Sequence, residues 1–192
     1  MDTLRISEIF LSLQGESRSA GWPTVFVRLT GCPLRCLYCD TAYAFSGGEV
    51  LSIDEILAKV RSYQTLHVCV TGGEPLAQPG CLKLLGALAD EGYEVSLETS
   101  GAFGVAEVDN RIIKVLDLKT PSSGEEGKNL YANIQHLLPQ DQVKFVIMNE
   151  GDYRWSVEKL KQYRLPELCE ARWPGRDAAF HRSTRLRTDH QT

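Results

Sequence analysis

Short runs of branched apolar residues recur along the chain, and turn-forming residues bound each run. Runs of this length and composition are typical of β-strands. Five runs are interpreted as strands, at residues 25–29, 66–70, 94–98, 113–117 and 143–147. Their regular return predicts one sheet.

Apolar residues at helical spacing lie between these strands. The first predicted helix begins after Ser52, which forms a capping-box pattern with Glu55. Two later helices are predicted over 131–138 and 153–163, the second with Asp152 as its N-cap. The apolar faces of the first two helices consist of Ile53, Ile56, Leu57 and Val60, and of Leu82, Leu85, Leu88 and Ala89.

The alternation of strands and helices indicates the fold class. Strands that alternate with helices imply βαβ units and a parallel sheet with right-handed crossovers. A closed eightfold barrel usually needs more than the 192 residues present here. We therefore expect an α/β fold, a partial or open βα barrel with a parallel sheet. Ligands of such sheets gather at the C-terminal ends of the strands.

Composition narrows the function classes. The chain is 43% hydrophobic and 24% charged, as in ordinary globular proteins, and its formal net charge is -4. That charge gives no electrostatic reason for a nucleic-acid partner. No run approaches the roughly 18 apolar residues of a membrane span, and the first residues lack a signal-peptide pattern. We expect a cytoplasmic protein with no membrane partner.

The last stretch of the chain differs from the rest. Residues 171–192 show no helical or strand period, and arginine is frequent there. We therefore divide the chain into one domain over 1–170 and an atypical segment over 171–192. The segment is expected to be disordered, or to result from a change of reading frame near residue 170. A polar loop is also predicted over 120–129.

Three of the six cysteines crowd together directly after the first predicted strand. Cys32, Cys36 and Cys39 have the spacing CxxxCxxC. Three thiolates can hold three irons of a [4Fe-4S] cluster and leave the fourth iron open to a small molecule. Zinc is the alternative, but zinc sites usually complete four ligands, and only His67 or Cys69 offers a fourth. The spacing favours the cluster, and the other cysteines are interpreted as small buried side chains.

A second motif, Thr71-Gly72-Gly73-Glu74, closes the next predicted strand. Glycines let a ligand approach the backbone closely, and Glu74 can accept a hydrogen bond from an ammonium group. By itself the motif would be an ordinary turn. Together with the cysteines it resembles the radical S-adenosylmethionine (SAM) superfamily, in which SAM binds the open iron and is cleaved by one electron.

The next two strand ends also carry polar side chains. Glu98 and Ser100 follow the third predicted strand, and Lys119 follows the fourth. The resemblance implies that Ser100 and Lys119 bind SAM, beside Thr71, Gly72, Gly73 and Glu74, and that Glu98 is a catalytic residue facing the substrate. The alternatives are a turn with local hydrogen bonds and a solvated lysine.

A more specific series lies near the N-terminus. The segments SLQGE, VRLTGC and CDT occupy residues 12–16, 27–32 and 39–41. This series is similar to the 7-carboxy-7-deazaguanine synthase family of queuosine biosynthesis, over roughly residues 4–150. The resemblance implies conversion of 6-carboxy-5,6,7,8-tetrahydropterin to 7-carboxy-7-deazaguanine with loss of ammonia. It also implies Mg²⁺, a homodimer, and an electron donor such as flavodoxin or ferredoxin.

The resemblance assigns further residues. Arg28 would bind the substrate carboxylate, as a bidentate guanidinium can, and Thr41 would offer its hydroxyl to Mg²⁺. Taken alone, these two side chains would be read as a structural ion pair and a turn cap, and Gln14 and Glu16 as solvated loop residues. The residues implied to touch the pterin are Leu13, Gln14, Gly15, Glu16 and Thr71.

Two other functions stay open at this point. A radical SAM activase of a partner protein would share the cysteines, but is not expected to carry SLQGE and CDT. A non-catalytic metal-binding relative, damaged at its C-terminus, would not need the Gly-Gly pair or Glu74. The ring-contracting synthase is the leading interpretation.

Overall fold

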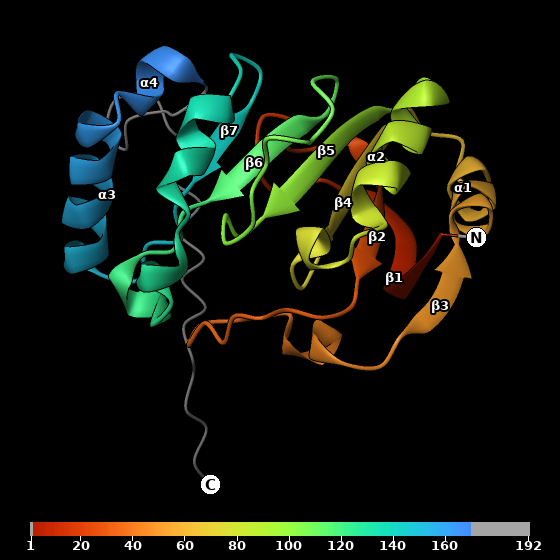
Figure 1. Cartoon of the computed structure of the whole chain (residues 1–192), viewed down its shortest axis with the longest axis horizontal. Helices are drawn as coiled ribbons and strands as arrows, with labels where there is room; N and C mark the ends of the chain where they lie inside the picture. Colours follow the sequence, from red (N-terminus) through yellow and green to blue (C-terminus); the bar gives the residue numbers. More distant parts are fainter. Residues whose placement is uncertain (1, 170–192) are drawn as a thin grey trace, which may run out of the picture.

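The computed structural model describes residues 2–169. The predicted segment 171–192, with the hypothesis about its origin, lies outside the described residues. Seven strands form one open sheet in the order β3-β1-β2-β4-β5-β6-β7 (Figure 1). The strands are β1 (Thr3–Leu13), β2 (Pro23–Leu29), β3 (Glu49–Ser52), β4 (His67–Gly72), β5 (Glu94–Thr99), β6 (Ile113–Asp117) and β7 (Gln142–Lys144). The open βα-barrel class is therefore confirmed.

The sheet is mixed: the five strands predicted from the sequence pair in parallel, as expected, and β1 and β3, which were not predicted, add an antiparallel edge. The strands from β2 through β4, β5 and β6 to β7 pair in parallel. β1 instead pairs antiparallel with both β2 and β3. The physical reason is the short connection over residues 14–22, because a parallel pair needs a crossover of about a dozen residues or more.

The predicted strands match the observed ones at four of five places. β2, β4, β5 and β6 coincide with the apolar runs to within about two residues, the usual uncertainty of element ends. β7 is shorter than predicted and ends at Lys144. Beyond it, the Thr120 hydroxyl donates to the Val146 carbonyl, at 2.8 Å, so a loop holds this stretch in place of a strand ladder.

Two helices cover one face of the sheet (Figure 1): α1 (Ile53–Arg61) and α2 (Cys81–Asp90). The capping box of α1 is present, since the Glu55 amide donates to Ser52 Oγ and the Ser52 amide donates to Glu55 Oε2, at 3.3 and 2.7 Å. The core lies between these helices and the sheet, and its strand residues include Val27, Val70 and Leu97, each fully buried.

The C-terminal helices required two corrections. Residues Tyr131–His136 form a 3-10 helix, η5, where an ordinary helix was predicted. α3 (Glu150–Gln162) begins after Asn149, whose side chain accepts from the Asp152 amide, at 3.0 Å, so Asn149 and not Asp152 is the N-cap. The remaining short helices are α4 (Leu165–Leu168), η1 (Ala42–Phe45), η2 (Pro75–Ala77), η3 (Pro121–Ser123) and η4 (Glu126–Lys128).

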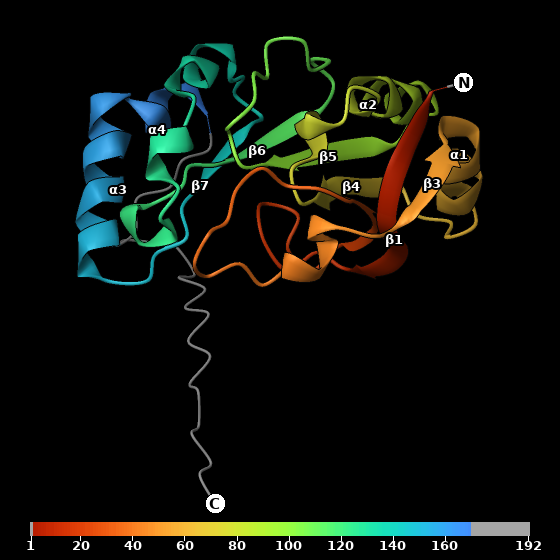
Figure 2. The same cartoon turned by 60° about the horizontal axis from the view of Figure 1, so that its bottom comes forward.

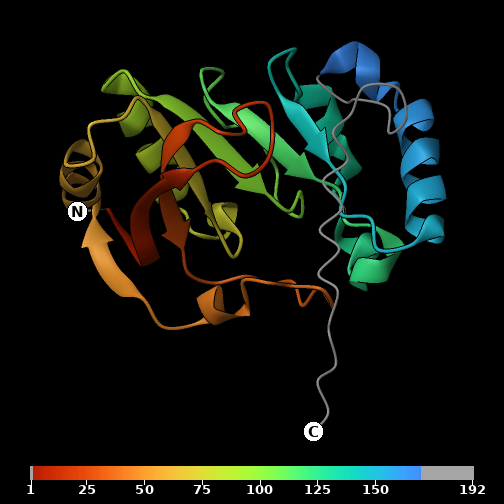
Figure 3. The same ribbon diagram turned by 180° about the vertical axis from the view of Figure 1, so that it is seen from behind.

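The opposite face of the sheet is crossed by loops. Seen from behind, the loop between β1 and β2 lies over the middle strands (Figure 3), and the turned view places it on the same side as the loop after β2 (Figure 2). We call this side the concave face. No helix within residues 2–169 is long and apolar enough to cross a membrane.

Candidate active site

The concave face carries a row of polar side chains from neighbouring strands. Arg28 of β2 is in register with Thr71 of β4, and the Thr71 hydroxyl donates to Glu98 Oε2 of β5, at 3.2 Å. Successive residues of a strand point to opposite faces. The apolar neighbours of these three residues therefore enter the core, while the row itself faces the loops.

A β-bulge brings Glu8 of β1 to the same face. The pairing of β1 with β2 shifts between Ile6 and Glu8. Before the shift Ile6 packs in the core, and after it Phe10 stacks on Phe26 of the concave face, with ring centroids 5.2 Å apart. A bulge of this kind changes which face the following residues occupy. It places the Glu8 carboxylate opposite Arg28.

Arg28 is held by Glu8 and two aromatic rings. Its Nε donates to Glu8 Oε1, and the Tyr43 hydroxyl donates to the same oxygen, both at 2.7 Å. The guanidinium lies 5.9 Å from the ring centroids of Phe10 and of Tyr43. Burial alone would raise the pKa of Glu8, but the bonds from Tyr43 and Arg28 outweigh it and lower that pKa. Both terminal nitrogens of Arg28 lack a partner among residues 2–169.

The β1–β2 loop brings the SLQGE segment over this row. Gln14 is only 5% exposed, its amide donates to the Trp22 carbonyl, and its carbonyl accepts from the Gly21 amide, at 2.9 and 2.7 Å. Gly15 and Glu16 are exposed, and the Leu13 side chain is 62% exposed. The structure therefore places Gln14 inward and Leu13 outward.

Cys69 lies under this loop and was interpreted from the sequence only as a buried thiol. It is fully buried, as expected. Burial raises the pKa of the Cys69 thiol well above its usual value, and the charge of Glu98 raises it further, while Ser96 and Gln14 act in the opposite direction. Cys69 is therefore a neutral thiol of β4, buried beneath Gln14 of the loop.

The three clustered cysteines lie on the loop that follows β2. Cys32 and Cys36 are half-buried, Cys39 is exposed, and all three are free thiols. The Cys39 amide donates to the Cys36 carbonyl, at 3.1 Å, which forms a turn between them. Within residues 2–169 no three His, Cys, Asp or Glu side chains are already drawn together as a metal-ligand group.

The thiols nonetheless fit an iron–sulfur cluster. Burial is the main cause that raises the pKa of both Cys32 and Cys36, and the charge of Cys39 acts in the same direction on both. Neutral thiols with raised pKa values become ligands when a bound metal stabilises the thiolates. Three unpaired thiols on one loop supply three ligands and leave one iron open.

The loop over 120–129 supports the cysteine loop, a role that the sequence did not reveal. The Leu37 amide donates to the Ser123 carbonyl, at 2.9 Å, and the Arg35 amide donates to Glu125 Oε1, at 2.6 Å. These contacts join residues about 90 apart in the chain. A polar loop carries no local signal for such a partner, so only the fold could show it.

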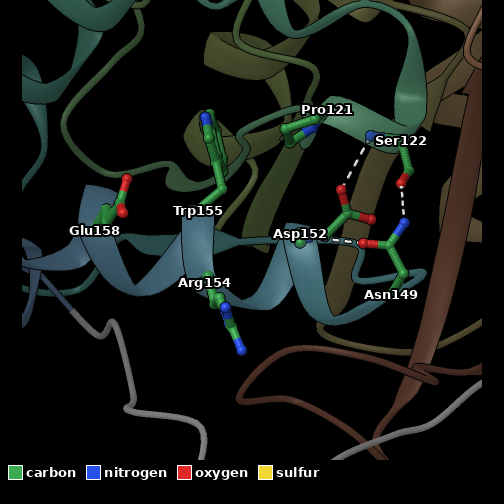
Figure 4. A pocket seen from close by; sticks show the side chains of 8 residues that line it. Pro121, Ser122, Asn149, Asp152, Arg154, Trp155 and Glu158 are labelled. Carbon is green, nitrogen blue, oxygen red and sulfur yellow. Dashed lines mark hydrogen bonds between the residues drawn. The ribbon is translucent and has the colours of Figure 1, made fainter.

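α3 anchors that supporting loop beside a surface hollow of about 490 Å³ (Figure 4). The buried Asp152 carboxylate accepts from the amides of Ser122 and Met148, at 3.0 and 2.9 Å, and the Asn149 side chain donates to Ser122 Oγ, at 2.7 Å. None of the predicted site residues lines the hollow. It is part of the support of the site and not the site itself.

The two glycines of Thr71-Gly72-Gly73-Glu74 are needed for packing against the cysteine loop. A Cβ on Gly72 would lie 2.1 Å from the Leu29 carbonyl oxygen, and one on Gly73 would lie 2.1 Å from the Gly31 carbonyl oxygen. The Glu74 amide donates to the same Gly31 oxygen, at 2.8 Å. Any side chain here would push the two loops apart.

Glu74 joins the ends of two strands. It is fully buried, and its carboxylate accepts from the Leu76 amide, from the Thr99 hydroxyl, and from both the amide and the hydroxyl of Ser100. These four bonds occupy the acceptor positions of both oxygens. In this arrangement Glu74 positions the loop, and its contact with the ammonium group of SAM stays a prediction. The same holds for Ser100 and the ribose.

Lys119 lies beside the cysteine loop. Its Nζ donates to Asp117 Oδ2, at 2.8 Å, and both side chains are mostly buried. Burial acts to lower the pKa of Lys119, but Asp117 outweighs it, with Cys36 and Tyr38 adding, and the pKa is raised. Lys119 is therefore a firmly protonated group next to the thiols.

Thr41 ends the CDT segment at the start of η1. Its hydroxyl donates to Asp40 Oδ1, at 2.8 Å, and makes no capping bond to the helix. Thr41 is therefore the N-cap residue of η1 through its backbone carbonyl, which accepts from the Ala44 amide at 3.0 Å, and its side chain takes no part in the cap. Two neighbouring oxygens on an exposed segment are a donor set that suits a hard cation retaining waters.

Lys144 is a further charged residue of the concave face that the sequence did not single out. It is in register with Asp117 on β6, and its Nζ donates to Glu16 of the β1–β2 loop. A lysine within a short apolar run is usually solvated, so the local sequence gave no reason to choose it.

Comparison with known proteins agrees with this geometry. The profile of the radical SAM superfamily matches residues 26–166. The crystal structure of QueE from Escherichia coli is similar with a TM-score of 0.70 and 26% identity, over 83% of this chain and 78% of that chain. A structure of TYW1 with a lysine-pyruvate adduct bound is similar in fold alone, with a TM-score of 0.56 and 10% identity. The fold and the cysteine loop thus define a radical SAM enzyme.

Similar sequences narrow the family. The 7-carboxy-7-deazaguanine synthase of Chlorobaculum tepidum is 47% identical, over 86% of this chain and 77% of that protein. The synthase of Koribacter versatilis is 43% identical, over 84% of this chain and 73% of that protein. The chain belongs to the 7-carboxy-7-deazaguanine synthase family. The family assignment made from SLQGE, VRLTGC and CDT is confirmed.

Proposed function

We propose that this chain converts 6-carboxy-5,6,7,8-tetrahydropterin to 7-carboxy-7-deazaguanine with release of ammonia. The observation that carries the proposal is the meeting of the cysteine loop and the Arg28–Thr71–Glu98 row on one face of the sheet. The substrate and the two products balance without an outside oxidant. The cluster and SAM, when bound, supply the radical that takes a hydrogen atom from the substrate.

The substrate carboxylate is assigned to Arg28. Glu8 already engages Nε, so the two terminal nitrogens remain for a bidentate pair with a carboxylate. The β1–β2 loop lies over the row. The residues at its start are the exposed Glu16, the buried Gln14 and, through their backbone, Leu13 and Gly15. We assign them to the pterin ring, whose edge both donates and accepts hydrogen bonds.

Glu98 is proposed as the catalytic residue. Its carboxylate accepts from Thr71 in the middle of the row, so both groups are oriented before a substrate arrives. Such orientation lets Glu98 accept a ring N–H and hold the reacting carbon at one position. Thr71 contributes to both the substrate and the SAM side of the site.

SAM is assigned to the ends of β4, β5 and β6. The Gly72-Gly73 backbone abuts the cysteine loop, and Lys119 supplies a protonated group for the carboxylate of SAM. Ser100 is assigned to the ribose. Glu74 is assigned to the amino group through the peptide carbonyls of its loop, because Leu76, Thr99 and Ser100 already occupy both carboxylate oxygens.

Further parts of the proposal are Mg²⁺, a reductant and an assembly. Mg²⁺ is assigned to Thr41, beside the Asp40 carboxylate, with the substrate carboxylate as a shared ligand. We also propose a flavodoxin- or ferredoxin-type electron donor, a homodimer and a cytoplasmic location. Support for the location is chemical, because free thiols and a cluster need a reducing compartment.

The test is an anaerobic reaction of the whole chain. The protein is reconstituted with iron and sulfide, then given SAM, Mg²⁺, a reductant and the carboxypterin. Mass spectrometry is expected to find the carboxy-deazaguanine, with SAM not consumed in proportion to product. SAM cleavage without that product would overturn the proposed substrate. Activity only with a second protein would favour an activase.

A further inference from the structure

The β1–β2 loop spans the concave face and is fastened to the far strand of the sheet. The Arg18 amide donates to Gln142 Oε1 of β7, at 3.0 Å, and Lys144 of β7 donates to Glu16. These two contacts join residues 124 and 128 apart in the chain. Figure 3 shows the loop reaching across the middle strands toward β7.

The geometry points to Lys144 as a positioning residue. We propose that the Lys144–Glu16 pair, with the Gln142 contact beside it, holds the β1–β2 loop over the concave face and so fixes Gln14 and Glu16 for substrate binding. At its base the loop is closed by Gln14, which pairs with Gly21 and Trp22, and by Trp22, whose ring packs on His67. The inference rests on the proposed function for the identity of the substrate.

The charges around Lys144 favour this role. Lys144 faces Asp117, Glu16 and Glu98, and these carboxylates outweigh the effect of burial, so the pKa of Lys144 is raised. Lys144 is therefore always protonated in the working pH range. One ammonium group facing three carboxylates attracts the loop carboxylate to a fixed point and reduces repulsion among them.

The free energy needed to order the loop on substrate binding explains the expected effect on affinity. A loop that must be ordered when the substrate binds reduces the affinity, whereas a loop held beforehand does not. We call the Lys144–Glu16 pair the latch. Its loss should raise KM for the carboxypterin and leave kcat nearly unchanged, because Gln14 and Glu16 still reach the bound substrate. The pair is partly exposed, so the expected rise is about five- to ten-fold.

The experiment compares four variants of the whole chain. Lys144→Met removes the latch, and Lys144→Arg keeps its charge. The exchange Lys144→Glu with Glu16→Lys restores the pair with reversed charges. Lys59→Met is the matched control, because Lys59 forms a similar pair with Glu49 at the opposite end of the sheet, at 3.4 Å. Steady-state kinetics and hydrogen exchange of amides 15–20 are measured for each.

The inference predicts faster hydrogen exchange at Arg18 and its neighbours in Lys144→Met alone. KM should rise in Lys144→Met, and also in the charge-reversed pair, which replaces the substrate-binding Glu16. Lys144→Arg should recover most of both properties. The charge exchange should recover loop protection. An unchanged rate of amide hydrogen exchange in Lys144→Met would overturn the inference. So would a charge-reversed pair, Lys144→Glu with Glu16→Lys, that fails to restore the protection of the loop amides. If the parent chain does not act on the carboxypterin, the proposed function fails while the exchange data still test the latch.

Discussion

The two faces of one sheet differ in composition although the same strands supply both. On the helix-covered face, Val27, Val70 and Leu97 are fully buried. One position further along the same strands, Arg28, Thr71 and Glu98 form the polar row of the concave face. Adjacent residues thus lie in the core on one face and in the candidate site on the other. The comparison teaches that a parallel strand can carry a site without weakening its core.

The helix-covered face also holds a buried ion pair. Lys114 Nζ lies 2.8 Å from Asp141 Oδ2, and the two side chains are 1% and 0% exposed. Asp141 also accepts from the amides of Lys114 and Leu138. These bonds fix β6 to the segment before β7, so this face is not purely apolar.

The largest expected effect concerns the site side of the comparison. Cys36→Ser should abolish the cluster and all turnover, since one of three thiolate ligands is lost. The free energy of unfolding of the cluster-free protein should change by less than about 0.5 kcal/mol. Iron and sulfide analysis with chemical denaturation measures both. Cys81→Ala is the control, because Cys81 is buried among apolar side chains and should leave the iron content intact.

The next effect should appear at the buried pair. Asp141→Ala leaves the Lys114 ammonium buried without its partner, and breaking such a pair costs about 3–5 kcal/mol. Urea denaturation of the cluster-free protein measures this loss. The matched variant Asp109→Ala removes a surface partner of Arg111 and should cost far less. Equal losses in the two variants would contradict the distinction.

Two neighbouring residues of β5 test the comparison most directly. Leu97→Ala should destabilise the fold by about 2–5 kcal/mol, because it opens a cavity in the core. Glu98→Gln should leave stability within about 0.5 kcal/mol and lower kcat/KM by about ten- to a hundred-fold, since a charge-assisted bond is lost. Chemical denaturation measures the stability of both variants, and steady-state kinetics measures their kcat/KM. A stable Leu97→Ala or a fully active Glu98→Gln would break the comparison.

The smallest effect is expected far from the site. Ser52→Ala removes the side-chain half of the capping box of α1 and should cost about 1 kcal/mol. Thermal unfolding measures it, and turnover at a permissive temperature should be unchanged. Ser52→Thr is a control that keeps a capping hydroxyl. A loss of activity in Ser52→Ala without a loss of stability would link α1 to the site.

Local signals determined much of this protein. The apolar runs predicted four strands, the helical spacing predicted α1 and α2, and the capping box formed as expected. The cysteine spacing and the motifs after successive strands indicated the radical SAM superfamily, and the comparisons confirmed the family. These properties depend on residues close in sequence, where periodicity and motif spacing carry the information.

Only the tertiary structure decided the remaining features. The antiparallel β1, the bulge that turns Glu8 toward Arg28, the support of the cysteine loop by Ser123 and Glu125, and the Lys144–Glu16 pair all depend on distant partners. The local sequence around a side chain near a strand end is the same whether that side chain meets solvent or a loop from 128 residues away. Long-range pairing sets the environment of such residues, and their own sequence context does not.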